Sequence, residues 1–141
     1  RAFFFREKNR AIDLQVIKKV TLGSGPSVLF SHNVTAPSGD PAGFRTAVEF
    51  NVLVNDRRFM ARPVSLKSDR LILKDIYSGA VTEFFTDRSA EIQVHPIFTV
   101  NETESGLRST FQGMSILFAV PAEHKYDERK GSSLRISLVP G

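Results

Sequence analysis

The chain has 141 residues, 41% of them hydrophobic, a formal net charge of +4 and no cysteine. This length suits one domain, and the lack of cysteine excludes disulfides, thiol nucleophiles and cysteine-based zinc sites. No apolar run is long enough for a membrane-spanning helix. The lysines and arginines are scattered rather than gathered in a stripe with interleaved aromatics, which argues against nucleic acid as a partner. We expect a cytoplasmic protein.

The first 45 residues predict short strands followed by a loop. Residues 3–9 form either a short strand or a helical turn, residues 11–20 alternate as a strand, and residues 28–30 form another. Residues 33–45 are rich in Pro, Gly, Asn and Asp, which predicts a loop. We therefore expect residues 1–45 to be an N-terminal extension whose strands pack on the same fold. Residues 46–141 are then a β-barrel core, and the whole is one domain.

Residues 47–66 predict the central β-hairpin. Two alternating runs flank Asn55 and Asp56, which form a two-residue turn signal. With that turn, Glu49 lies opposite Arg62 in a favourable cross-strand charge pair. The same register gathers the apolar side chains on the other face, namely Val48, Phe50, Val52, Val54, Phe59 and Ala61.

The remaining residues predict further strands, at 71–73, 81–85, 91–100, 107–120 and 133–139, with turns or polar loops at 67–70, 77–79, 87–89 and 101–106. Gly113 lies inside one of these strands, which predicts a kink or bulge. No segment shows a helical period. About nine short strands with regular turn signals predict an all-β, antiparallel split barrel or sandwich with little helix.

No catalytic constellation is visible in the sequence. His32, His95 and His124 share no ligand spacing, there is no Gly-x-Ser-x-Gly elbow for a serine triad, and paired acidic residues lie in predicted loops. We therefore expect a protein that is not an enzyme and has no metal site. The alternative is a histidine-centred site, which requires the three histidines to converge on one pocket.

The candidate ligand-binding residues are basic. Arg6 and Arg10 are spaced i, i+4, and such pairs can clamp a phosphate group with bidentate hydrogen bonds. Arg129, Lys130 and Arg135 flank a glycine and the last predicted strand. They could form an anion site where this domain meets another.

From residue 46 to 141 the sequence resembles the N-terminal domain of bacterial flagellar-brake proteins, the domain that precedes PilZ. The resemblance is in the two strands and turn of residues 47–68, in the Asp69-Arg70-Leu71-Ile72-Leu73 strand, and in the basic segment from Arg129 to Ser137. It implies a split β-barrel that cooperates with a PilZ domain in cyclic di-GMP signalling.

These observations predict a non-enzymatic regulatory or interaction module. Its partner would be another protein or an adjoining domain, it would need no cofactor, and cyclic di-GMP is its candidate ligand. The alternative is a structural assembly subunit, such as a jelly-roll or sandwich protein of a coat or appendage.

Overall fold

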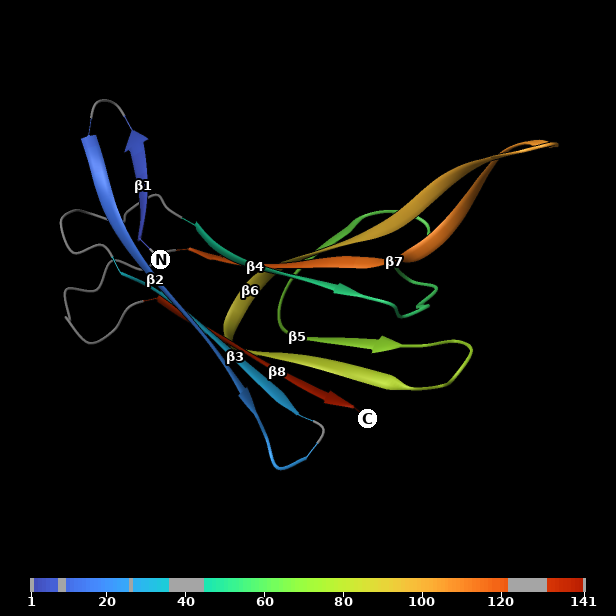
Figure 1. Ribbon diagram of the computed structural model, residues 1–141. Coiled ribbons are helices and arrows are strands. Elements are labelled where there is room, and N and C mark those ends of the chain that lie inside the picture. The colour runs from blue at the N-terminus through green and yellow to red at the C-terminus, as the bar shows by residue number, and fades with distance from the viewer. Residues whose placement is uncertain (1, 8–9, 26, 36–44, 122–131, 141) are drawn as a thin grey trace.

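The computed structural model describes residues 2–7, 10–25, 27–35, 45–121 and 132–140, with the backbone alone at 2–7, 10–14, 33, 35, 46, 121 and 132–140. The described residues form eight strands and no helix, so the predicted all-β class is confirmed. All strands pair antiparallel in one sheet that curls on itself (Figure 1). In chain order they are β1 (Ala2–Glu7), β2 (Arg10–Leu22), β3 (Val28–Thr35), β4 (Arg45–Val52), β5 (Val64–Lys74), β6 (Val81–Thr103), β7 (Gly106–Pro121) and β8 (Ser132–Pro140).

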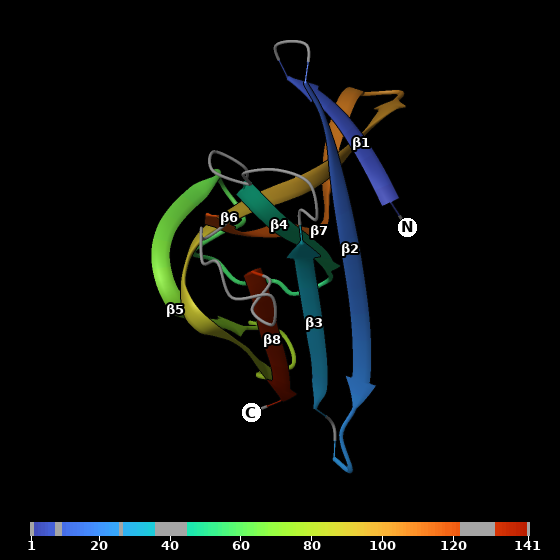
Figure 2. The same ribbon diagram turned by 90° about the vertical axis from the view of Figure 1, so that its left-hand side faces the viewer.

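Strand β6 organises the sheet because it pairs with three neighbours. Around Phe84 it pairs with β5 on one edge and with β8 on the other. From Glu91 onward, β7 takes the place of β8. The order is therefore β1-β2-β3-β8-β6-β7-β4, with β5 on the far edge of β6. Strands β1 to β3 join this sheet through β8 (Figure 2).

Two predicted turns, at residues 67–70 and 87–89, are wrong, because both segments lie inside long strands. The register between β5 and β6 jumps from Ser68 opposite Ala90 to Arg70 opposite Phe85. In this irregular stretch the Thr86 hydroxyl donates to the carbonyl of Arg88 at 2.6 Å. A bulged corner of a sheet favours the same polar residues as a turn, so the sequence pattern did not separate the two.

The predicted hairpin of residues 47–66 is also wrong. Strand β4 pairs with β7 instead, and Glu49 lies opposite Leu117. The Glu49 carboxylate accepts a hydrogen bond from the Ser115 hydroxyl at 2.6 Å, in place of the predicted pair with Arg62. Residues 53–63 form no strand and lead to β5, and within them Phe59 enters the core.

The core fills the space inside the curl of the sheet. Phe84 and Phe118 are fully buried, with ring centroids 5.6 Å apart, and Phe50 packs against both of them. Phe30 of β3 meets Phe50 at 4.8 Å, which ties β3 to this cluster. Burying each such side chain stabilises the fold by about 1.5–3 kcal/mol. The other fully buried large residues are Leu73, Ile92, Val94, Met114, Ile116 and Val120.

Gly113 marks the place where β6 and β7 leave the rest of the sheet. The register shifts between Ile97 opposite Gly113 and Phe98 opposite Phe111, so the predicted bulge is confirmed. The φ angle of Gly113 is +140°, and a Cβ atom there would lie 2.6 Å from the carbonyl oxygen of Val52, at the end of β4. Beyond this point the two strands project alone as a ribbon over residues 98–111, at the upper right of Figure 1.

No helix of the described residues has the length and apolar character that crossing a membrane requires.

Candidate functional site

The ribbon of residues 98–111 has one apolar and one polar face. Directly opposed residues point to the same side of a sheet, and residues two apart on one strand share a face. The pairing of Phe98 with Phe111 and of Val100 with Ser109 therefore defines one face, to which Glu102 and Leu107 also belong. The other face is polar and consists of Thr99, Asn101, Thr103, Arg108 and Thr110.

The apolar face of the ribbon continues the core side of the sheet. Ile92 and Val94 are fully buried, and the same alternation along β6 leads to Phe98 and Val100. Phe111, at the base of the ribbon, packs against the core cluster. The side chains that face the interior within the curled sheet are thus followed by apolar side chains that project beyond it.

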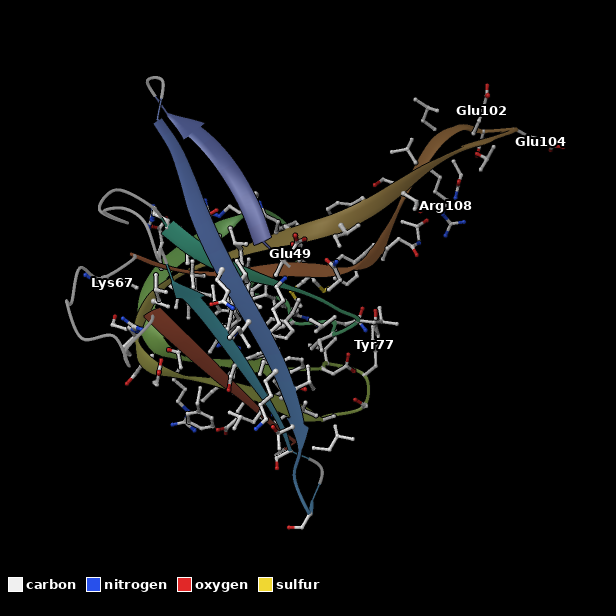
Figure 3. The ribbon with its side chains drawn as sticks, turned by 60° about the vertical axis from the view of Figure 1, so that its left-hand side comes forward. Glu49, Lys67, Tyr77, Glu102, Glu104 and Arg108 are labelled. Atoms are coloured by element: carbon white, nitrogen blue, oxygen red, sulfur yellow. The ribbon has the colours of Figure 1, made fainter. Side chains whose placement is uncertain are left out.

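Within this structure the apolar face of the ribbon is open to solvent. The side chains of Phe98, Val100 and Leu107 are 45%, 63% and 79% exposed. Phe98 meets Phe111 edge-to-face, with ring centroids 5.8 Å apart. Contiguous exposed apolar residues on a soluble protein mark interaction sites. Figure 3 shows Glu102, Glu104 and Arg108 at the tip of this ribbon.

The side chain of Asp75 joins two loops, residues 53–63 and residues 75–80. One carboxylate oxygen accepts from the backbone and side-chain amides of Asn55, at 2.8 and 2.9 Å. The other accepts from the backbone N–H groups of Tyr77 and Ser78 and from the Ser78 hydroxyl. The Ser78 and Asn55 hydrogen bonds hold the pKa of Asp75 far below its usual range. The loops expose Leu53, Ile76 and Tyr77, and Tyr77 is labelled in Figure 3.

Asp56, the second residue of the predicted hairpin turn, is buried and anchors the same loop. Burial by itself raises the pKa of Asp56, but the Arg58 guanidinium at 2.6 Å and the backbone N–H groups of Lys74 and Arg58 outweigh it, so the pKa lies below its usual value. The bond to Asp56 raises the pKa of Arg58. Arg58 also donates to the carbonyl of Ile72 at 2.6 Å.

A shallow hollow of about 670 Å³ lies between these two loops, lined by Asp56, Arg57, Arg58, Ile72, Lys74, Asp75, Ile76 and Gly79. Its two carboxylates already accept several N–H or O–H donors each, so their oxygens are occupied by the protein itself. Such hydrogen bonds hold the two loops in place and stabilise the ionised form of each carboxylate. Across the described part of the chain no three His, Asp or Glu side chains are grouped to hold a metal ion.

The histidines do not support a shared pocket among the described residues. His32 lies on β3, on the same face as Phe30, which packs against the core cluster, and is 8% exposed. His95 is exposed on β6, next to buried Val94 and therefore on the opposite side of the sheet. His124 lies outside the described residues. Among the described residues neither ring nitrogen of His32 has a hydrogen-bond partner, and burial, with Lys18 nearby, lowers the pKa of His32.

For the predicted basic residues the structure describes either the backbone alone or no atoms at all. Arg6 and Arg10 lie on either side of the connection between β1 and β2. Arg135 of β8 is opposite Ser31, which in turn is opposite Lys19 of β2. The distance along β2 from Lys19 to Arg10 is roughly 30 Å at the rise of an antiparallel strand, so the register does not bring Arg135 to the other two.

Arg129 and Lys130 lie outside the described residues, and an anion site at these positions stays a prediction. The exposed face of the ribbon, by contrast, was not identified from the sequence. Phe98 and Val100 lie within the predicted strand of residues 91–100, but the sequence does not distinguish a covered face from an exposed one.

Comparisons with known proteins identify a family. Residues 1–131 match the model of the family described as "Alpha-amylase/4-alpha-glucanotransferase, C-terminal". The fold is similar to that of the 4-α-glucanotransferase from Thermococcus litoralis, with a TM-score of 0.71 and 20% sequence identity. That match covers 98% of this chain and 20% of the glucanotransferase, so the chain spans about one fifth of the solved enzyme. No curated protein sequence matches.

These findings correct the predicted resemblance and function. The match is to the C-terminal domain of glucan-acting enzymes, so the resemblance to flagellar-brake proteins is wrong. The predicted regulatory module linked to PilZ and cyclic di-GMP is therefore wrong as well. No finding supports the alternative of a coat or appendage subunit. The resemblance rested on a hairpin at residues 47–66 that the structure does not contain.

Proposed function

The chain belongs to the family of C-terminal domains of α-amylases and 4-α-glucanotransferases, and from this premise we propose that it is a non-catalytic module of a larger enzyme that acts on α-glucan. The observation that carries the proposal is the family match over residues 1–131. A fold match that covers nearly all of this chain but one fifth of a 4-α-glucanotransferase supports it. The chemistry would then belong to the other part of the polypeptide.

The ionisation of the described carboxylates also supports a non-catalytic role. Cleavage of a glycosidic bond generally needs a carboxylic acid whose pKa is raised, so that it holds a proton for the leaving group. Among the described residues, every carboxylate with a shifted pKa has it lowered instead. A hydrogen bond from Arg45 lowers the pKa of Glu91, and the pKa values of Asp56 and Asp75 are lowered too.

The proposal is tested in the complete enzyme with a maltooligosaccharide as substrate. Replacing a general acid or base typically lowers kcat by about 10²- to 10⁴-fold. We expect Asp56→Asn, Asp75→Asn and Glu91→Gln, each checked for folding by circular dichroism, to keep kcat within about threefold of the parent enzyme. A folded variant with a kcat loss of about a hundredfold or more would place catalytic chemistry in this module and refute the proposal.

Deleting the whole module gives a second readout. We expect the catalytic portion, if it stays soluble, to retain glucan transfer or hydrolysis with reduced thermal stability. A soluble catalytic portion with no detectable bond cleavage, restored when the module is added back, would show that the module supplies part of the active site.

A further inference from the structure

We propose that the apolar face of the β6–β7 ribbon, formed by Phe98, Val100, Leu107 and Phe111, is the surface that docks this module onto the catalytic portion of its own enzyme. The surface that receives it is apolar and has a basic residue opposite Glu102. This inference rests on the proposed function, because it requires a catalytic portion in the same polypeptide.

The ribbon needs a cover to be stable as it stands. Beyond Gly113 it consists of two strands without a third neighbour, and an isolated two-stranded hairpin is at best marginally stable in water. One of its faces is apolar and exposed, with Leu107 at 79% and Val100 at 63%. Covering that face would bury apolar area and hold the two strands together at the same time.

The chemistry of the face favours a protein surface over a glucan. Sugar binding combines aromatic rings that lie flat against the sugar with several polar side chains on its hydroxyl groups, whereas this face offers only Ser109 and Glu102 as polar side chains and holds Phe98 edge-to-face against Phe111. The catalytic portion is favoured over a second copy of this chain. The match covers only 20% of the solved relative, so most of that enzyme lies outside the matched domain. Tethering in one polypeptide raises the effective concentration of the partner surface, so that a modest apolar face suffices.

Glu102 indicates the charge of the receiving surface. It lies on the apolar face directly opposite Leu107, and within the described residues it makes no ion pair. Covering the face would remove water from this carboxylate, and burying an unpaired carboxylate is strongly unfavourable. A basic residue on the catalytic portion would compensate for that loss.

The experiment is site-specific photocrosslinking in the complete enzyme. A benzoylphenylalanine replaces Leu107 on the apolar face in one variant, and Arg108 on the polar face in the matched control. We expect Leu107→benzoylphenylalanine to crosslink within one polypeptide to a peptide of the catalytic portion, with a yield at least about tenfold above that of the Arg108 control. Adding Glu102→Lys should lower this yield about fivefold or more, whereas Glu104→Lys, in the turn, should leave it unchanged.

Other outcomes overturn the inference. Equal yields at both positions, or no crosslink from position 107, would show that the apolar face is not docked. A crosslink that joins two polypeptides would assign the face to a second copy, and a crosslink to added maltooligosaccharide would assign it to glucan. The kcat of the carboxylate variants above tests the proposed function separately, because docking can fail while the module remains non-catalytic.

Discussion

Replacing Gly113 by alanine tests why the ribbon begins where it does. A φ angle of +140° is strained for alanine by about 1–3 kcal/mol. The new Cβ atom would also lie 2.6 Å from the carbonyl oxygen of Val52, and relieving such an overlap in a packed sheet requires about 1–3 kcal/mol more. We therefore expect Gly113→Ala to lower the free energy of unfolding by about 2–6 kcal/mol.

Two other glycines separate the two effects. Gly106 has a φ of +115°, and a Cβ atom added there would have no other atom within 4 Å, so Gly106→Ala should show the backbone strain alone, about 1–3 kcal/mol. Gly25 has neither strain nor a close neighbour, so Gly25→Ala should be neutral or slightly stabilising. Urea unfolding followed by circular dichroism measures all three. If Gly113→Ala and Gly106→Ala lowered the free energy of unfolding by equal amounts, the close approach of β7 to the end of β4 would be refuted.

Two further predictions concern buried ionisable groups. His32 has a pKa below that of a free imidazole, so the unfolded chain binds more protons and stability falls as pH drops below about 6.5. His32→Leu should flatten the fall in melting temperature between pH 7 and pH 5. His95→Gln, at an exposed position, should leave that fall unchanged. Identical slopes of melting temperature against pH in the two variants would contradict the burial of the His32 ring. Asp56→Ala should lower the free energy of unfolding by about 2–3 kcal/mol, because the N–H of Lys74 and the guanidinium of Arg58 lose their acceptor. The pKa of Asp56 is lowered on folding, so its contribution is present above about pH 4 and lost as pH falls below that. Asp69→Ala, at an exposed position, is the control. Equal urea unfolding midpoints for Asp56→Ala and Asp69→Ala at pH 7 would rule out the anchoring role of Asp56.

The fold class followed from the sequence because strand alternation is a local property. The strand predicted at residues 91–100 lies within β6, and the bulge at Gly113 is confirmed. The partner of each strand is not a local property. Asn55 and Asp56 have the composition of a hairpin turn, but their side chains bind backbone N–H groups and a carboxylate near residues 74 and 75. A residue type that closes a tight turn can also join distant loops, and in this structure Asn55 and Asp56 make the distant contacts.

The apolar face of the ribbon could be predicted only in part. The spacing of Phe98, Val100 and Leu107 identifies a face, but whether these strands project as a two-stranded ribbon depends on where their sheet neighbour β4 ends. Strand β4 ends at Val52, opposite Met114, and this follows from the register of two strands distant in sequence. The family was missed for a related reason, since the resemblance rested on a strand pairing that does not form.

The sequence separation between paired strands implies an order of assembly. Strands β5, β6 and β7 are consecutive hairpins, whereas β3 meets β8 by pairing Ser31 with Arg135 across most of the chain. Closing long loops slows folding, so we expect the β5–β7 meander to form first and β8 to join β3 last. Pulse-labelled hydrogen exchange during refolding would show amides of β6 and β7 protected before those of β3. A chain emerging from the ribosome would then hold β1 to β3 without their sheet neighbour until β8, at the far end of the sequence, has been synthesised.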